Sequence, residues 1–561
     1  DALAIAKNHG IRLEHIDRMS KETGIELVAT NDVHYLRKED AEVQDILLCV
    51  QMGKTIDDPT RMKFQTQEFY YKTYEEMLEA FPGYERALDI TNEIADKVDV
   101  VIRSKSHGDI RGIDPKYVLP ANERELLLSP ARPIVLLKAK KEFPVGVCDN
   151  SDFIGAFLPC NPIQILILDC ISPLIMTSAN LSGEPIVIDD EEIKKFGVKI
   201  LSHNREILTP LDDSVVQINA GEVQFIRRAR GYVPLAIDVG IKAKSNILAL
   251  GGDLKSSFAI MHGNYVYPSQ YFGDLEDAKC FEAYKSNIDR FCRLHSFTPE
   301  KIVCDMHPLY YSSTAMQTSG EYQHHLAHAY SVIAEHKLKG DVLSFVFDGT
   351  GYGTDGAIWG GEVFFNQKRV EHLEYTKMLS SDEVAKNADI CLACYDKSNP
   401  LVKSAIEHNI NTVNSSSMGR LFDAVAAVLD ICHYNTYEGE CAIALERTAR
   451  KAGTAFELTP TLSPKAIIEE IKNANAPKEE IALGFHHMLA RLIVNIAKKH
   501  NAKQVTLSGG CFNNRILTER TFELLKQSNI NVYINNKVPS GDQGLCLGQA
   551  YLAALDEQEE G

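Results

Sequence analysis

The chain has 561 residues, 45% of them hydrophobic and 24% charged, a composition typical of a soluble globular protein with two to four domains and not of a disordered or fibrous one. Its formal net charge of −18 gives an average field that repels nucleic acid and anionic membranes, and no segment has an apolar run long enough to cross a bilayer. The 13 cysteines are odd in number and lack the spacing of a disulfide framework, which predicts a reducing, cytoplasmic environment.

The first block, residues 1–103, has a charged helical pattern, with helices predicted over 2–8, 73–81 and 84–98. The chain starts with Asp1 beside the first of these helices, so we expect a fragment at its amino end. After a predicted strand over 26–29, Asp32 and His34 stand at alternate positions, as half of a metal site would require. A strand end with a capping aspartate explains the same residues equally well.

Part of this block resembles a known family. The stretch 27–54, with Asp57-Asp58-Pro59 and Phe69-Tyr70, resembles the end of the PHP domain of bacterial DNA polymerase III alpha subunits. It departs from that family where Gln44-Asp45 replaces the usual His-Asp pair. The resemblance implies a partial (β/α) fragment that binds metal poorly and does not polymerise DNA, because the other ligands of that domain would lie upstream and no polymerase palm follows.

A polar segment with glycine and proline, residues 104–122, predicts a linker, and a second block follows over 123–236. Its predicted strands, which alternate with helical stretches and favour an α/β or α+β domain, are 133–137, 174–177, 215–219 and 222–226. Ser178 and Asn180 offer hydroxyl and amide groups to a nucleotide, and Arg228 and Arg230 offer guanidinium forks to phosphate. An ordinary surface turn and a solvated basic run explain these residues equally well.

The second block resembles the YrdC-like domain of HypF-type carbamoyltransferases, and the matching segments are 127–135, 178–180, 212–215 and 227–234. The resemblance implies a domain that makes carbamoyl-adenylate from ATP and a carbamoyl donor. The match starts part way into that domain. Its upstream Lys/Arg-bearing strands, and the acylphosphatase domain and paired CxxC zinc region that precede it in the family, have no counterpart here. This departure puts the adenylation step in doubt.

The third block, 245–556, begins with a predicted strand over 246–250, and its long helices, predicted over 276–293, 417–429 and 481–499, would cover a mixed sheet. Three glycine turns follow apolar strands, at 250–253, 348–353 and 507–510. Singly each is only a turn. Together they predict two ribonuclease-H-like lobes that hold a nucleotide, with strand–turn–strand units over 246–261 and 342–363 that present backbone N–H groups to phosphates.

His324 and His328 stand four residues apart, which places both imidazoles on one face of a helix, at the spacing that one metal ion can bridge. Asp348 and Asp542 are acidic candidates for further ligands. The alternatives are that the histidines face solvent or cap a helix, and that Asp542 is a turn residue. Two cysteine features carry less weight: the pair Cys391 and Cys394 lacks a second CxxC, and Cys511 is interpreted as a packing residue.

The third block resembles the Kae-type (TsaD-like) domain of HypF-type carbamoyltransferases over about 310 residues. The matching stretches, which occur in family order, are 249–255, 273–276, 304–308, 324–328, 347–361, 416–423, 437–439 and 507–514. The resemblance implies that a divalent ion (zinc, iron or magnesium) touching nucleotide phosphate is held by His324, His328, Asp348 and Asp542. It implies that the phosphates are lined by Gly251, Gly252, Lys255, Gly349, Gly351, Gly509 and Gly510. It places Gly419, Asp423 and Glu438 near the nucleoside. Without the resemblance, Asp423 is interpreted as a solvent-facing helix residue.

The sequence thus predicts an α/β multidomain chain: a partial PHP fragment, a partial YrdC-like domain, and two ribonuclease-H-like (actin-like ATPase) lobes. The implied function is the carbamoyltransferase of nickel–iron hydrogenase maturation, which uses ATP and carbamoyl phosphate to carbamoylate the carboxyl-terminal cysteine of HypE, with no nucleic acid or membrane as partner. The alternatives are a DNA polymerase III alpha fragment, which fits only the first 103 residues, and a nucleotide- and metal-binding module unable to make the adenylate. Two unrelated partial families in one chain suggest a gene fusion, an assembly error or a designed chimera.

Overall fold

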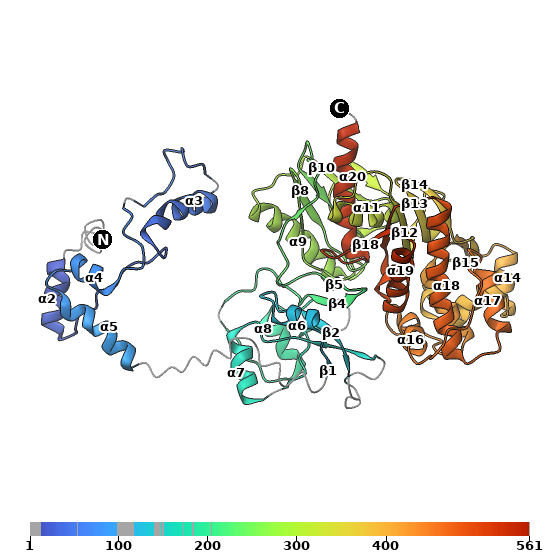
Figure 1. The fold of residues 1–561 in the computed structure, drawn as a ribbon, viewed down its shortest axis with the longest axis horizontal. Helices are drawn as coiled ribbons and strands as arrows, with labels where there is room; N and C mark the ends of the chain where they lie inside the picture. Colours follow the sequence, from blue (N-terminus) through green and yellow to red (C-terminus); the bar gives the residue numbers. More distant parts are fainter. Residues whose placement is uncertain are drawn as a thin grey trace. The chain divides into compact units, whose positions relative to one another are not determined.

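The computed structural model describes residues 13–97 except 53 and 65, 117–139, 147, 151–203 except 172, 182 and 183, and 205–559 (Figure 1). The predicted helix over 2–8 and most of the predicted linker over 104–122 lie outside the described residues. The chain forms two compact units, Asp1–Ser106 and His107–Gly561. In the described part no helix is long and apolar enough to span a membrane.

The first unit contains the elements α2 (Leu13–Thr23), η1 (Lys38–Asp40), α3 (Ala41–Met52), α4 (Tyr74–Ala80) and α5 (Glu85–Lys97). Thr73 caps helix α4. Its side chain accepts a hydrogen bond from the Glu76 amide, and the Glu76 carboxylate accepts one from the Thr73 amide. The predicted helices 73–81 and 84–98 are therefore confirmed. The predicted strand over 26–29 is wrong, because this segment pairs with no strand in the part of the chain that the structure describes: the Ala29 amide donates to the Ala87 carbonyl (3.0 Å) and Ala29 packs on α5.

The second block is a five-stranded sheet in the order β1-β2-β4-β5, with β3 paired to β2. Its elements are β1 (Tyr117–Val118), α6 (Ala121–Leu128), β2 (Ile134–Ala139), β3 (Phe153–Ala156), α7 (Pro162–Cys170), α8 (Asp190–Ile193), η3 (Lys194–Phe196), β4 (Val215–Asn219) and β5 (Glu222–Arg227). Three of the four predicted strands form. The strand predicted over 174–177 does not, because no described strand lies beside it, and Ile175 is 80% exposed.

The third block contains two mixed sheets that share a five-stranded core, which confirms the two predicted lobes. In each core, three consecutive strands are antiparallel neighbours, and two later strands lie parallel to the first of these three on its other side, which is the ribonuclease-H-like arrangement. The first sheet has one further strand and the second has two. The first sheet contains β6 (Ile237–Asp238), β7 (Ile247–Ala249), β8 (Ala259–His262), β9 (Tyr265–Pro268), β10 (Lys301–Asp305) and β11 (Gly320–Tyr322). The second contains β12 (Leu343–Tyr352), β13 (Ile358–Phe365), β14 (Lys368–His372), β15 (Thr376–Leu379), β16 (Thr412–Ser415), β17 (Gln504–Ser508) and β18 (Asn531–Ile534).

Helices cover both sheets, as predicted (Figure 1). They are α9 (Ala278–Leu294), α10 (Tyr311–Thr314), α11 (His324–His336), α12 (Asp382–Lys386), α13 (Ala388–Asp396), α14 (Pro400–Glu407), α15 (Met418–Val428), α16 (Glu440–Ala449), α17 (Pro464–Asn473), α18 (Lys478–Lys499), η4 (Gly510–Asn513), α19 (Arg515–Gln527), η5 (Asp542–Gly544) and α20 (Leu545–Glu559). Helices α11 and α20 share a core with residues of both sheets, so the lobes are joined by packed side chains.

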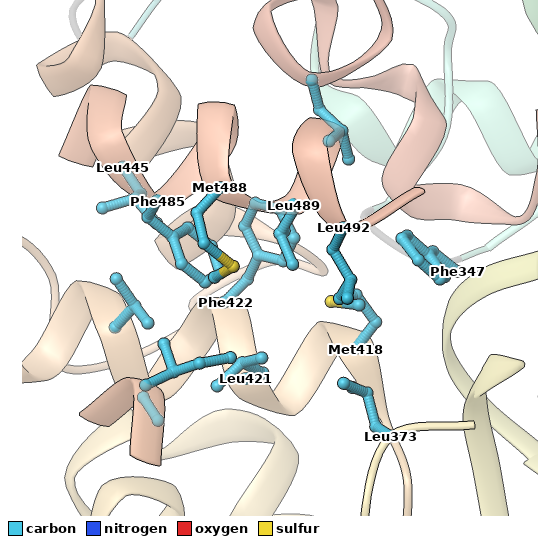
Figure 2. Close-up of a cluster of buried hydrophobic side chains, with 14 of the residues drawn as sticks. Phe347, Leu373, Met418, Leu421, Phe422, Leu445, Phe485, Met488, Leu489 and Leu492 are labelled. Atoms are coloured by element: carbon cyan, nitrogen blue, oxygen red, sulfur yellow. The ribbon is translucent and has the colours of Figure 1, made fainter. Parts of the chain in front are cut away.

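The largest core lies in the second lobe, where α15 and α18 meet (Figure 2). Phe422 of α15 packs edge-on against Phe485 of α18, with ring centroids 5.0 Å apart. Cys391 and Cys394 of α13 are buried in the same cluster. Burial among apolar side chains raises the pKa of Cys391 well above its usual value, so this pair packs as small apolar side chains.

His486 of α18 is fully buried beside Phe422 and Phe485 and is held in its neutral form. Its Nδ1 donates to the Ala482 carbonyl (2.7 Å) and its Nε2 accepts from the Asn514 amide (2.9 Å). Burial lowers the pKa of His486 from 6.5 to about 4. The unfolded chain takes up a proton below 6.5 that the folded chain cannot, so the free energy of unfolding should fall by about 3 kcal/mol as the pH falls through this window.

Denaturant unfolding of the wild type and of His486→Gln at about pH 7 and about pH 4 tests this prediction. The difference in unfolding free energy between the two proteins should shift by about 3 kcal/mol between these pH values. A difference that does not depend on pH would contradict it.

Candidate metal and nucleotide site

Four buried side chains from three elements converge between the lobes. His324 and His328 come from α11, Asp348 from β12 and Asp542 from η5, and one ligand atom of each lies within 4.8 Å of the others. The Gln323 side chain caps α11 by accepting from the Leu326 amide (2.9 Å), so His324 occupies the first turn and His328 the next turn on the same face. The predicted helix face is confirmed, and the structure brings the four predicted ligands together.

The distances between these ligand atoms fit a four-coordinate divalent ion. His324 Nε2 lies 3.6 Å from Asp348 Oδ2 and 3.7 Å from Asp542 Oδ1, and the corresponding distances from His328 Nε2 are 3.8 and 3.5 Å. Ligands at the usual distances from a tetrahedral ion are separated by about 3.3–3.6 Å. Both Nε2 atoms are buried and have no hydrogen-bond partner. An ion would satisfy these imidazoles, so the donor set fits a metal.

Asp305 orients one of the imidazoles. It ends β10, is buried, and its Oδ2 lies 2.8 Å from His324 Nδ1. Burial lowers the pKa of His324, but the Asp305 carboxylate outweighs it and holds that pKa well above its usual value. A proton held at Nδ1 leaves Nε2 to face the other candidate ligands, as in carboxylate–histidine–metal triads. Sequence reasoning missed this role, although an aspartate within the matching stretch 304–308 was the available signal.

The turn at Gly509 and Gly510 contacts Asp348 rather than exposing its amides. The Gly510 amide donates to Asp348 Oδ1 (3.0 Å) and the Gly509 amide to the Ser540 carbonyl (2.9 Å). Both N–H groups are therefore engaged within the protein, and the implied place of Gly509 and Gly510 beside the phosphates stays a prediction. Gly509 has a φ of +92°, and a Cβ there would lie 2.3 Å from the Phe347 carbonyl oxygen. Glycine is required because the turn approaches β12 so closely.

The turn after β7 meets the second lobe through an ion pair. The Gly251 amide donates to the Gln549 side chain (2.8 Å), and Gly252 lies against the side chains of Leu545 and Tyr310. Lys255 Nζ lies 2.8 Å from a carboxylate oxygen of Glu438, and both side chains are exposed. The predicted phosphate and nucleoside groups Lys255 and Glu438 thus come together across the two lobes.

The remaining predicted residues of the third block also gather near Asp348. A Cβ on Gly419 would lie 2.9 Å from Gly349 Cα, and one on Gly351 would lie 2.3 Å from the His325 ring. Asp423 is buried, and it accepts from Asn435 (3.2 Å) and pairs with Arg420 at 2.8 Å. The solvent-facing interpretation of Asp423 is therefore wrong, because its carboxylate is buried between Arg420 and Asn435.

Ser178 and Asn180 line a cavity of about 190 Å³ where the second block contacts the first lobe. Asn180 Nδ2 donates to the Glu184 carbonyl (2.9 Å), which fixes the orientation of its amide. The Arg227 guanidinium also lines this cavity and lies 4.6 Å from the centre of the Tyr271 ring. The four metal-ligand candidates do not line it. Ser178 and Asn180 therefore mark a second, separate place where a ligand could contact the chain.

Arg228 and Arg230 do not point into this cavity. The Arg228 guanidinium is buried and donates to the carbonyls of Pro268, Tyr232 and Leu235. Arg230 pairs with Asp213 at 2.6 Å and donates to the carbonyls of Ala131 and Arg132. Contrary to expectation, both guanidinium groups are engaged within the protein: Arg228 joins loops of the second block to β9 of the third, and Arg230 holds loops of the second block together. Arg227, the first arginine of the same basic run, is the one that lines the cavity.

The remaining candidates are Cys511 and the pair of Asp32 and His34. Cys511 packs against the core of the second lobe, and burial raises the pKa of its thiol well above the usual value. In the first unit, His34 Nε2 lies 3.2 Å from Asp32 Oδ2, and the His34 ring packs against Phe64 and Phe69. Among the described residues no third histidine, cysteine or carboxylate completes a metal site with this pair.

Three family models match the chain in order. Residues 108–229 match the Sua5/YciO/YrdC family model, described as telomere recombination. Residues 242–335 match the HypF Kae1-like domain, and residues 344–549 match the second subdomain of the carbamoyltransferase Kae1-like domain.

Known carbamoyltransferases are similar over most of the chain. Carbamoyltransferase HypF of Synechocystis sp. is 33% identical over 502 residues, which cover 79% of this chain and 65% of that protein. HypF of Rhodobacter capsulatus is 32% identical over 84% of this chain and 70% of that protein. A crystal structure of full-length HypF in a phosphate- and nucleotide-bound form superposes with a TM-score of 0.76 and 34% identity, over 82% of this chain and 81% of that one.

The first block has a different relative. The DNA polymerase III alpha subunit of Helicobacter pylori is 48% identical over 84 residues, which cover 15% of this chain and 7% of that protein. The chain spans about two thirds of the length of the curated carbamoyltransferases it matches. Since its second and third blocks match the domains of these proteins in sequence and in fold, the chain belongs to the HypF carbamoyltransferase family.

Proposed function

We propose that the chain is a carbamoyltransferase of hydrogenase maturation. Carbamoyl phosphate would be hydrolysed to carbamate and phosphate, and the carbamate oxygen would attack the α-phosphorus of ATP in the YrdC-like domain, residues 123–236, which gives carbamoyl-adenylate and releases pyrophosphate. The Kae-type domain, residues 245–556, would then pass the carbamoyl group to the carboxyl-terminal cysteine of HypE. The observation that carries this proposal is the buried cluster of His324, His328, Asp348 and Asp542, which lies beside glycine turns between two nucleotide-binding lobes. Family membership and the nucleotide-bound relative support it.

The residues of the site have distinct roles in this proposal. The four ligands would hold a divalent ion, which when bound supplies positive charge to phosphate oxygens. Asp305 keeps a proton on His324 Nδ1. Lys255, which pairs with Glu438 across the two lobes, adds a positive charge. The acceptor thiolate attacks the carbamoyl carbon, the bond from that carbon to the adenylate oxygen breaks, and AMP leaves with the electron pair. No nucleophile of this chain is required, and Cys511 is a packing residue in this mechanism.

A second candidate is a binding module that accepts nucleotide and metal but cannot make the adenylate. The engagement of Arg228 and Arg230 with main-chain carbonyls favours it, since the second block then offers fewer cations to ATP phosphates. The polymerase alternative rests on the first block alone, where similarity extends over 84 residues.

Two assays separate these functions. The first is pyrophosphate exchange into ATP that depends on carbamoyl phosphate, and the second is mass spectrometry of HypE after addition of carbamoyl-adenylate. We expect the second assay to show one added carbamoyl group on HypE. Transfer without exchange would mean that only the first step is missing. ATP binding without transfer would contradict the carbamoyltransferase proposal and favour the binding module.

A further inference from the structure

Asp542 is held by a short turn that is tied on both sides to the second block. The turn runs from Ser540 to Gly544 and contains η5, a single 3-10 turn. Before Asp542, Ser540 Oγ accepts from Gln224 Nε2 of β5 (3.2 Å). After Asp542, the Gln543 side chain accepts from the Arg228 amide (3.0 Å) and donates to the Arg228 carbonyl (2.6 Å). All these groups are buried, so no solvent competes for them.

Gln224 also contacts the segment that follows the glycine turn at 507–510. Gln224 Nε2 donates to the Phe512 carbonyl (3.1 Å) in η4, which begins at Gly510 and is capped by Gly509. The Ser540 carbonyl accepts from the Gly509 amide (2.9 Å), so the two turns are bonded to each other as well. One side chain of β5 therefore contacts the turn that carries Asp542 and the turn that contacts Asp348.

The orientation of the Gln224 amide is fixed by its neighbours on the sheet. Its Oε1 accepts from Gln217 Nε2 (2.8 Å) and from Asn219 Nδ2 (2.9 Å), both on β4. Because two donors point at the oxygen, the Gln224 NH₂ group has to face the third block, where two acceptors lie. A buried amide that is engaged at both its oxygen and its nitrogen has one low-energy orientation.

We propose that Gln224 and Gln543 are positioning residues of the metal site, and that the second block is thereby a structural part of that site in addition to any adenylation role. A carboxylate on a short turn keeps its place only through contacts outside the ion's coordination shell, and such contacts tune metal affinity. This inference rests on the metal site of the proposed function. It concerns the geometry of Asp542 and not the chemistry of transfer.

The test is a Co²⁺ titration of the chelator-treated full-length chain, read by calorimetry and by visible absorption, which reports the geometry around cobalt. Gln224→Leu and Gln543→Leu should each weaken Co²⁺ binding about 10-fold and change the visible bands. Thr518→Val is the matched control: the Thr518 hydroxyl also donates to the Phe512 carbonyl (2.8 Å), but it has no hydrogen bond to the 540–544 turn. We expect its affinity to stay within about twofold of the wild type.

A milder variant keeps the test decisive if a leucine variant fails to fold. Ser540→Ala removes only the hydroxyl that accepts from Gln224, and it should weaken Co²⁺ binding about threefold. Wild-type affinity and spectrum in Gln543→Leu and Ser540→Ala, or an equal loss in Thr518→Val, would overturn the inference while leaving the metal site intact. Absence of Co²⁺ binding by the wild type would instead overturn the metal site of the proposed function, and this inference with it.

Discussion

Replacing His328 by alanine should lower Co²⁺ affinity and carbamoyl transfer to HypE by at least about 100-fold each, since loss of an outer partner of a ligand already costs 10–100-fold. The reason is geometric: His328 Nε2 is one of four converging ligand atoms, lies 3.5 Å from Asp542 Oδ1, and has no other partner. Without it, two buried carboxylates face each other with one imidazole between them. An ion in a three-ligand site would bind more weakly, and less positive charge would face the phosphates.

The matched control for this prediction is His336→Gln on the same helix. His336 Nε2 donates to the Ile534 carbonyl (2.7 Å), and a glutamine amide can replace that donor. The Co²⁺ affinity of this variant and its rate of carbamoyl transfer should each stay within about twofold of the wild type. Metal affinity and transfer are measured separately, by Co²⁺ titration and by mass spectrometry of HypE. If His328→Ala bound Co²⁺ as tightly as the wild type, the four-ligand site would be wrong.

Replacing Gly548 by alanine should lower the free energy of unfolding of the second unit by about 3 kcal/mol, the upper range for overpacking a core. Gly548 lies in α20 where this helix crosses α11, and a Cβ there would lie 1.8 Å from the Ala327 carbonyl oxygen. That oxygen belongs to the backbone of α11, which cannot move aside as a flexible side chain does. The helices would have to separate, and α11 carries both histidines, so Co²⁺ affinity should fall as well.

Gly453→Ala controls for the general effect of adding a methyl group. No atom lies within 4 Å of the position that its Cβ would take, and its φ is not in the left-handed region. Its unfolding free energy should therefore change by less than about 1 kcal/mol, with stabilisation the favoured direction. Guanidinium unfolding followed by circular dichroism compares the variants. Equal midpoints for Gly548→Ala and Gly453→Ala would show that the α11–α20 crossing tolerates a methyl group.

Helices and strands could be predicted from the sequence where the signal is local. The spacing of His324 and His328 depends only on the helical repeat, so both fall on one face of α11 as predicted. The strands 215–219 and 222–226 follow from apolar alternation about a short turn. The strand over 174–177 had the same apolar composition and does not form, because a strand also needs a neighbour, which composition does not supply.

By itself, then, the sequence determined the order of the domains, the two repeated lobes and the candidate ligands, because each depends on periodicity and turn chemistry over a few residues. Only the tertiary structure decided which polar groups are free to act. Asp305 orients His324 across 19 positions of the chain, and Gln224 contacts Ser540 across 316. Other long-range contacts engage Arg228, which donates to the Pro268 carbonyl, and the Gly509 amide, which donates to the Ser540 carbonyl. A hydrogen bond between distant residues leaves no periodic trace in the chain, so the supporting contacts of the site appear only when the fold brings them together.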